Sequence, residues 1–274
     1  MIRIGCSPHL NARPLTEGLD GESGVELTVA SPARLADLLR AGWLHAALTS
    51  SSECFGADYC IIPGAAISSA SAAADAVLFS RVPLTHLRRV ALNAASRSTN
   101  LLLRLVLHWL RPGAAITYEI RPEDTCRSLA DCDACLLIGD GAIVDTDVAE
   151  YRYDLARLWW EHTGLPMVLS LWLARPGVDK RVVRLLNSAR ERGLSRLHAL
   201  AEEYANARGW DRTLVTSYLT EAMDYSWTPR HEESLLRFGA ELHALGLVPG
   251  RRDLCYLGEN SESSQAPVES SQAT

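Results

Sequence analysis

Four consecutive polar residues, Ser96, Arg97, Ser98 and Thr99, stand directly before a long apolar segment and could together bind an anion. The first backbone N–H groups of a helix have no partner inside the helix, and the helix dipole places positive charge at the same end. Serine and threonine hydroxyls add donors there, and an arginine can hold a carboxylate through two parallel hydrogen bonds. The segment therefore predicts a carboxylate site, with an ordinary helix cap as the alternative.

Other polar or glycine-containing segments follow other predicted strands. Asn11 and Arg13 come after the strand "IRIGC", Ser50 ends the strand "LHAALTSS", and Gly139 and Asp140 follow the strand "ACLLI". The carboxyl ends of neighbouring strands in an α/β sheet form the edge where ligands bind. Each segment alone is typical of a turn or a solvated loop. Together they predict a cleft for a small polar or anionic ligand.

The elements that must position these residues form two α/β units. Strands and helices alternate up to about residue 85, the alternation restarts at Val90, and the apolar run 166–174 precedes a mainly helical end. Alternation of this kind predicts parallel sheets covered by helices. We expect one lobe from residues 1–85 and 175–257, an inserted lobe from 86–174, and a disordered tail at 258–274. The predicted helices are 14–19, one that starts at Ser31-Pro32 and is closed by Gly42, 98–110, 122–129, 179–206 with a break near Gly193, 211–223 and 229–245.

Composition excludes several classes of function. The chain has 274 residues, 47% hydrophobic residues and a net charge of −6, with lysine and arginine scattered along it. This pattern is globular and argues against nucleic acid as a partner. No run approaches the ~20 apolar residues of a membrane span, and the opening "MIRIGCS" lacks the features of a secretory signal. We therefore expect a cytoplasmic protein that does not bind a membrane.

The sequence carries no recognisable cofactor or metal motif. GxGxxG, P-loop, GxSxG and HExxH patterns are all absent, so no cofactor is expected. The cysteines at 126, 132 and 135 have neither a second pair nor histidines at zinc-site spacing, so no metal is expected. The seven cysteines are predicted to be reduced thiols, as is usual in the cytosol.

Several segments resemble the chorismate dehydratases of the futalosine route to menaquinone. They are "RIGCSPHLNARPLTEGL", "SSSECF", "ASRSTNLLLRLVL", "LLIGDGAI" and "YDLARLWWEHTGLPMVLSLWLAR", and the resemblance runs in order over about residues 2–248. It implies an α/β, two-lobed, periplasmic-binding-protein-like (type II) fold with a ligand cleft between the lobes. The implied reaction is elimination of water from chorismate to give 3-[(1-carboxyvinyl)oxy]benzoate. In this family the substrate's own enolpyruvyl carboxylate is thought to remove the ring proton.

The resemblance also implies roles for individual residues. Asn11 would orient the leaving hydroxyl or a carboxylate, and Ser50 would contribute a hydroxyl. Ser96, Ser98 and Thr99 would anchor a carboxylate at the helix start. Gly139 and Asp140 would line the opposite wall. Arg97 would either contact the substrate or brace its loop from behind.

This chain departs from the family pattern at three positions. His9 stands where an aromatic residue is usual, Arg13 where an uncharged residue is usual, and Asp75 where the family has a serine at the substrate. A carboxylate facing a dianionic substrate costs binding energy unless it is paired or protonated. We therefore predict an ion pair between Arg13 and Asp75.

Two alternatives to that pair remain open. In one, Arg13 faces solvent and Asp75 caps a turn. In the other, Asp75 is a catalytic general base for a substrate that lacks the enolpyruvyl carboxylate. The matching alternatives for function are an enzyme of this fold acting on a related anionic cyclohexadiene, or a non-catalytic protein that binds a small molecule.

Overall fold

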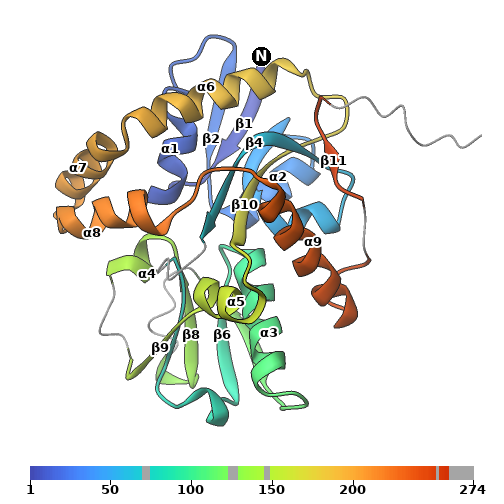
Figure 1. The fold of residues 1–274 in the computed structure, drawn as a ribbon, viewed down its shortest axis with the longest axis vertical. Helices are drawn as coiled ribbons and strands as arrows, with labels where there is room; N and C mark the ends of the chain where they lie inside the picture. Colours follow the sequence, from blue (N-terminus) through green and yellow to red (C-terminus); the bar gives the residue numbers. More distant parts are fainter. Residues whose placement is uncertain (70–74, 123–128, 145–148, 251–252, 259–274) are drawn as a thin grey trace, which may run out of the picture.

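The computed structural model describes residues 1–69, 75–122, 129–144, 149–250 and 253–258. These residues form two β-sheets, each in its own lobe, with helices around them (Figure 1). The first sheet has the strand order β11, β4, β10, β3, β1, β2, and the second has the order β7, β6, β8, β5, β9. The first-sheet strands are β1 (Ile2–Cys6), β2 (Val25–Val29), β3 (Ala46–Ser50), β4 (Cys60–Ser69), β10 (Met167–Ala174) and β11 (Cys255–Tyr256). The second-sheet strands are β5 (Ala76–Ser80), β6 (Arg89–Asn93), β7 (Thr117–Arg121), β8 (Ala134–Ile138) and β9 (Tyr151–Asp154).

Nine α-helices and four 3-10 or π-helical turns lie in the described part of the chain. The α-helices are α1 (Arg13–Thr16), α2 (Pro32–Arg40), α3 (Arg97–Leu110), α4 (Asp140–Val144), α5 (Leu155–Thr163), α6 (Arg181–Ser195), α7 (Leu197–Arg208), α8 (Arg212–Ser217) and α9 (Pro229–Ala244). The turns are η1 (Leu10–Ala12), η2 (Ser51–Phe55), η3 (Leu84–His86) and the π-helical η5 (Tyr218–Ala222). No helix among these residues is long and apolar enough to cross a membrane.

Two strands differ from the predicted lobe boundaries. β5 lies in the second sheet, between β8 and β9, although its residues were expected in the first lobe. β10 lies in the first sheet, between β3 and β4, although its residues were expected in the second lobe. Both strands are antiparallel to their neighbours, so the sheets are mixed and not parallel as predicted. A continuous apolar run shows that a strand is buried, but it does not show which sheet the strand joins.

The helices largely match the sequence pattern, with local exceptions. The predicted helix 98–110 is confirmed as α3. The predicted break near Gly193 is displaced, since α6 continues to Ser195. Gly193 is required inside α6 because a Cβ there would lie 2.0 Å from the backbone oxygen of Pro14. The segment after β8 begins α4 at Asp140, and neither this helix nor β9 and α5 were predicted. Most of the predicted helix 122–129 and of the predicted tail lies outside the described residues.

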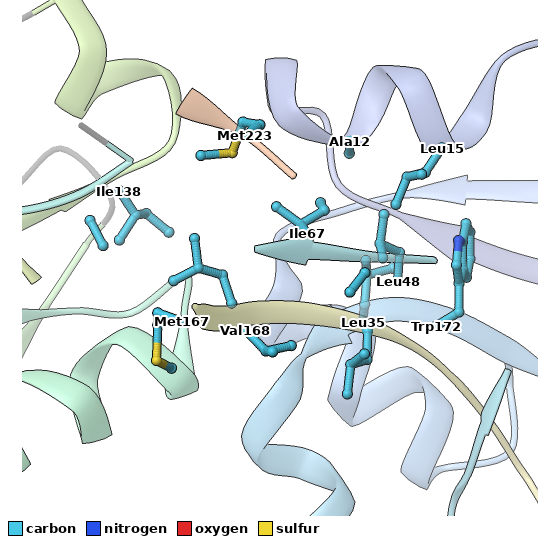
Figure 2. Packing of buried hydrophobic residues seen from close by; sticks show 14 of the residues in the cluster. Ala12, Leu15, Leu35, Leu48, Ile67, Ile138, Met167, Val168, Trp172 and Met223 are labelled. Carbon is cyan, nitrogen blue, oxygen red and sulfur yellow. The ribbon is translucent and has the colours of Figure 1, made fainter. Parts of the chain in front are cut away.

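The hydrophobic core continues from one lobe into the other. Ile67 of β4 and Val168 of β10 belong to the same buried cluster as Ile138 of β8 and Met223. Figure 2 shows these side chains, with Met167, where the two lobes meet. The lobes are therefore packed against each other in this conformation.

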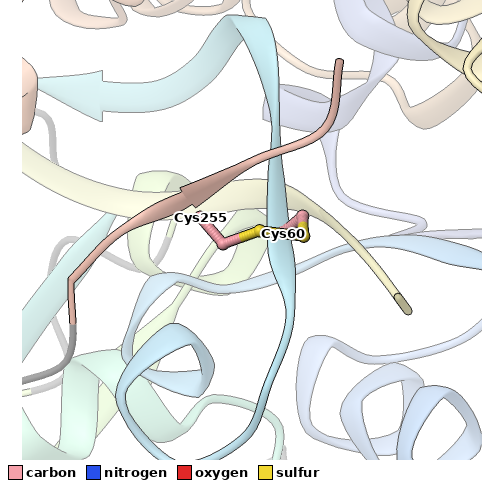
Figure 3. The surroundings of a disulfide bond; sticks show 2 residues. All are labelled: Cys60 and Cys255. Atoms are coloured by element: carbon pink, nitrogen blue, oxygen red, sulfur yellow. A yellow bond between two sulfur atoms is a disulfide. The ribbon is translucent and has the colours of Figure 1, made fainter. Parts of the chain in front are cut away.

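A disulfide joins Cys60 of β4 to Cys255 of β11 (Figure 3). The prediction that all the cysteines are reduced is therefore wrong for these two. β11 pairs with β4 in a register that places Cys255 beside Cys60, although 195 residues separate them in the sequence. Of the remaining cysteines, Cys6, Cys54, Cys132 and Cys135 are buried, and Cys126 lies outside the described residues.

Candidate functional site

A cavity of about 30 Å³ lies between the two lobes. Its first-lobe wall comes from Ser7, His9, Asn11, Pro32, Leu48, Ile67, Leu169 and Ser170, and its second-lobe wall from Asp75, Ser96, Thr99, Ile138 and Gly139. Five of the predicted site residues are thus brought together: Asn11, Asp75, Ser96, Thr99 and Gly139. Pockets that hold small organic ligands usually measure about 300–1,000 Å³. This conformation is therefore closed, and a ligand of that size requires the lobes to separate.

Asp75 forms the polar centre of the cavity. Its carboxyl group accepts hydrogen bonds from Asn11 Nδ2 at 2.9 Å and from the Tyr218 hydroxyl at 2.6 Å. η1 carries Asn11, Asp75 directly precedes β5, and η5 carries Tyr218. Burial raises the pKa of Asp75 to about 6, and the hydrogen bond from Tyr218 acts in the opposite direction. Sequence reasoning missed Tyr218, which stands 143 residues from Asp75 and in no recognisable motif.

Gly139 brings the two walls into close contact. Its φ is 56°, and a Cβ at this position would lie 2.7 Å from His9 Nδ1. Its N–H donates to the backbone oxygen of Asp75 at 2.8 Å. A side chain at position 139 would therefore be strained and would push His9 out of place.

Two buried polar atoms on the cavity wall have no hydrogen-bond partner among the described residues. They are Thr99 Oγ1 on the second lobe and His9 Nε2 on the first. Thr99 lies in the first turn of α3, where its N–H donates to the capping hydroxyl of Ser96 at 3.4 Å. Buried polar groups in folded proteins are nearly always satisfied, so two unpartnered polar atoms on residues that line one cavity favour a polar ligand there.

Ser98 and Ser50 join the lobes instead of lining the cavity. Ser98 Oγ accepts from the N–H of Ser52 at 3.0 Å and lies 3.1 Å from Ser51 Oγ. Ser50 Oγ accepts from the N–H of Arg97 at 3.1 Å. These bonds fix the start of α3 to the turn after β3.

Arg97 also points away from the cavity. Its guanidinium donates to Glu53 at 3.0 Å and to Asp37 at 2.5 Å, both on the first lobe. Of the two roles considered for Arg97, the structure therefore supports bracing the loop from behind.

Asp140 holds three elements together beside the cavity. Its carboxylate accepts from the N–H of Leu10 at 2.8 Å and from the Tyr204 hydroxyl, and Arg208 lies 3.8 Å away. Burial is the main cause of the raised pKa of Tyr204, followed by this hydrogen bond. Asp140 thus connects η1 and α7 to the second lobe, while the neighbouring Gly139 lines the cavity.

The predicted ion pair between Arg13 and Asp75 is wrong. Arg13 begins α1, and its half-exposed side chain lies 3.9 Å from Glu17, one helical turn farther along the chain. Asn11 and Tyr218 take the positions beside Asp75, so the buried carboxyl group has neutral donors and no ion-pair partner among the described residues.

Comparisons with known proteins agree with this architecture. A family model described as menaquinone biosynthesis matches residues 2–244. A chorismate dehydratase from Thermus thermophilus is 31% identical over 272 residues, covering 89% of this chain and 95% of that protein. Protein AF1704 from Archaeoglobus fulgidus superposes with a TM-score of 0.73 at 17% identity, covering 90% of this chain and 98% of that one. The periplasmic aliphatic sulphonate binding protein SsuA from Escherichia coli superposes with a TM-score of 0.62 at 17% identity, covering 91% and 94% of the two chains. The chain therefore belongs to the menaquinone biosynthesis family and has a two-lobed, periplasmic-binding-protein-like fold.

Proposed function

We propose that this protein is a carbon–oxygen lyase that eliminates water from chorismate to give 3-[(1-carboxyvinyl)oxy]benzoate. Its similarity to a chorismate dehydratase over most of both chains supports this activity. The observation that carries the proposal is the pair of orphaned polar atoms, His9 Nε2 and Thr99 Oγ1, on opposite walls of one cavity. Chorismate carries two carboxylates, so each wall has a polar atom for one of them.

The chemistry places few demands on the protein beyond holding the substrate. Loss of water makes the ring aromatic, which provides a large driving force. The site must orient the dianion, hold the leaving hydroxyl and exclude bulk water. Ser96, Thr99 and the first turn of α3 would bind one carboxylate, and Asn11 would orient the hydroxyl. The substrate's enolpyruvyl carboxylate would remove the ring proton.

The closed cavity implies a binding cycle. The lobes would open to admit chorismate and then close, so that the apolar contacts around Ile138 and Val168 shield the reaction from water. The bonds that Ser50, Ser98 and Arg97 make across the lobes would favour the closed state.

The direct test is to incubate the purified protein with chorismate and follow the aromatic product by mass spectrometry. The expected result is enzyme-dependent formation of a product one water lighter, reduced in Thr99→Val. Thr213→Val, an exposed threonine on α8, is the matched control and should match the parent. Saturable binding without product would overturn the proposal in favour of a binding protein. Turnover of a related anionic cyclohexadiene but not of chorismate would overturn it in favour of a variant enzyme.

A further inference from the structure

The two carboxyl oxygens of Asp75 have different surroundings. Asn11 Nδ2 and the Tyr218 hydroxyl both donate to Oδ1, at 2.9 Å and 2.6 Å. Oδ2 accepts no hydrogen bond from the described residues. Burial raises the pKa of Tyr218 well above its usual range, so that hydroxyl keeps its proton and remains a donor. A neutral Asp75 that keeps both of these incoming hydrogen bonds on Oδ1 carries its proton on Oδ2.

We infer that Asp75 acts as a neutral carboxylic acid whose Oδ2 proton is donated to the ring hydroxyl as that hydroxyl leaves. This inference rests on the proposed function, because it assigns a proton donor for the same elimination. Asp75 lines the cavity beside Asn11, the residue proposed to orient the hydroxyl. Its backbone is held by the hydrogen bond from Gly139 at 2.8 Å.

Burial favours the neutral form of Asp75, and the surrounding groups act in both directions. Asp75 is only 5% exposed, and burial is the largest cause of its raised pKa. Asp140 of α4 and Asp154 at the end of β9 raise that pKa further, while His9 and the Tyr218 hydroxyl lower it. Tyr225 also lies near, and the Asp75 charge raises the pKa of its hydroxyl. A dianionic substrate adds two more negative charges and so favours the neutral acid in the complex.

The resulting step is balanced in atoms and charge. The enolpyruvyl carboxylate takes the ring proton, and the electron pair of that C–H bond forms the new ring double bond. The C–O bond breaks with its electron pair on oxygen, which takes the proton of Asp75 and leaves as water. The enolpyruvyl carboxylic acid then returns a proton to Asp75, directly or through solvent. Chorismate is converted to the aromatic ether and one water, with no oxidant or other reactant.

Asp75→Asn separates hydrogen bonding from proton donation. An asparagine side chain oriented with its oxygen at the Oδ1 position keeps both incoming donors and places an N–H at the Oδ2 position, but it has no acidic proton to transfer. We expect KM to change little and kcat to fall about 10²–10⁴-fold, the usual contribution of a general acid. The parent kcat should fall as pH rises through the pKa of Asp75 in the complex, and this basic limb should be absent in Asp75→Asn. An unchanged kcat in folded Asp75→Asn would overturn the inference.

Tyr218→Phe tests the positioning of the acid. It removes a hydrogen bond that lowers the pKa of Asp75, so the basic limb should move to higher pH. A purely structural role for Tyr218 would lower stability without moving that limb.

The protonation state is measured independently of turnover by infrared difference spectroscopy. The carbonyl stretch of a neutral carboxyl group should be present in the parent below its pKa of about 6 and absent in Asp75→Asn. Asn11→Ala is used to slow the reaction so that chorismate stays bound. In this complex the carbonyl band should persist to higher pH than without chorismate, because the dianion favours the neutral acid. Absence of turnover with the band present would defeat the proposed function but leave the neutral acid in place. Turnover without the band in either state would overturn this inference alone.

Discussion

The guanidinium of Arg97 donates a hydrogen bond to the buried carboxylate of Glu53 at 3.0 Å, across the boundary between the two lobes. Glu53 is 6% exposed and also accepts from Arg40 at 2.9 Å. The first turn of α3 is thereby fixed to the turn after β3, and Thr99 in that first turn lines the cavity. The sequence suggests Arg97 as a substrate ligand, but in the structure Arg97 holds in place the helix start that carries Thr99.

Replacing Arg97 with methionine should lower the free energy of unfolding by about 1–2 kcal/mol. Glu53 would lose one of its two cations and remain buried, while KM for chorismate should stay close to that of the parent. Urea unfolding and steady-state kinetics measure the two effects. Arg157→Met, which removes an exposed pair with Glu161, is the control and should cost less than about 0.5 kcal/mol. A large increase in KM without loss of stability would instead indicate that Arg97 contacts the substrate.

Thr99→Val should weaken binding, whereas Ser98→Ala should lower stability. Thr99→Val removes an unsatisfied buried hydroxyl, so stability should be unchanged or slightly higher. Binding should weaken by about 1.5–3 kcal/mol if that hydroxyl donates to a carboxylate. Ser98→Ala breaks hydrogen bonds between the lobes and should cost about 1–3 kcal/mol of stability. Calorimetric titration with chorismate and urea unfolding compare the variants, and equal binding by Thr99→Val and the parent would place the carboxylate elsewhere.

Gly139→Ala should destabilise the protein by about 1–2 kcal/mol, because position 139 has a positive φ and its Cβ would collide with His9. Gly141→Ala is a close control, since it lies in α4 and a Cβ there has no neighbour within 4 Å. Alanine at 141 should be neutral or stabilising by up to about 1 kcal/mol. Thermal unfolding of the two variants is the measurement, and similar losses for both would show that helix α4, not the contact with His9, is responsible.

Stability should depend on pH through Asp75. Its pKa rises from an ordinary 3.8 to about 6 on folding, so the neutral form stabilises the folded state at low pH. That contribution should be lost as pH rises between these values, because the folded protein must then hold a buried charge. Relative to Asp75→Asn, the parent should lose about 3 kcal/mol across this range. Urea unfolding at a series of pH values tests this, and a constant difference between the two proteins would contradict it.

Cys255→Ser should lower stability by about 2–4 kcal/mol under oxidising conditions, since the disulfide closes a loop across most of the chain. In reductant the parent and the variant should unfold alike. Cys60→Ser and the double variant should match Cys255→Ser in both conditions. A further loss in the double variant would mean that the two thiols act separately.

Local signals in the sequence determined the main helices and strands and four of the thirteen residues that line the cavity. The hydroxyl cap at Ser96 and the apolar stripe after it predict α3, and the polar residues after strands predict Asn11, Thr99 and Gly139 at one edge. These signals depend on neighbours within a few residues, which is why a single sequence reveals them. The resemblance to chorismate dehydratases extended them to a fold and an activity.

Tertiary structure alone decided which polar groups face the cavity and which face each other. Arg13 and Arg97 have the chemistry of ligands, but their side chains pair with Glu17 and Glu53. Tyr218 donates a hydrogen bond to Asp75 from 143 residues away in the sequence. Cys60 likewise forms a disulfide with Cys255, 195 residues away. Both contacts depend on how distant strands and helices pack. The direction of a side chain at the end of a strand depends on which segments pack beside it. That information lies in contacts between distant parts of the chain, and no local pattern encodes it.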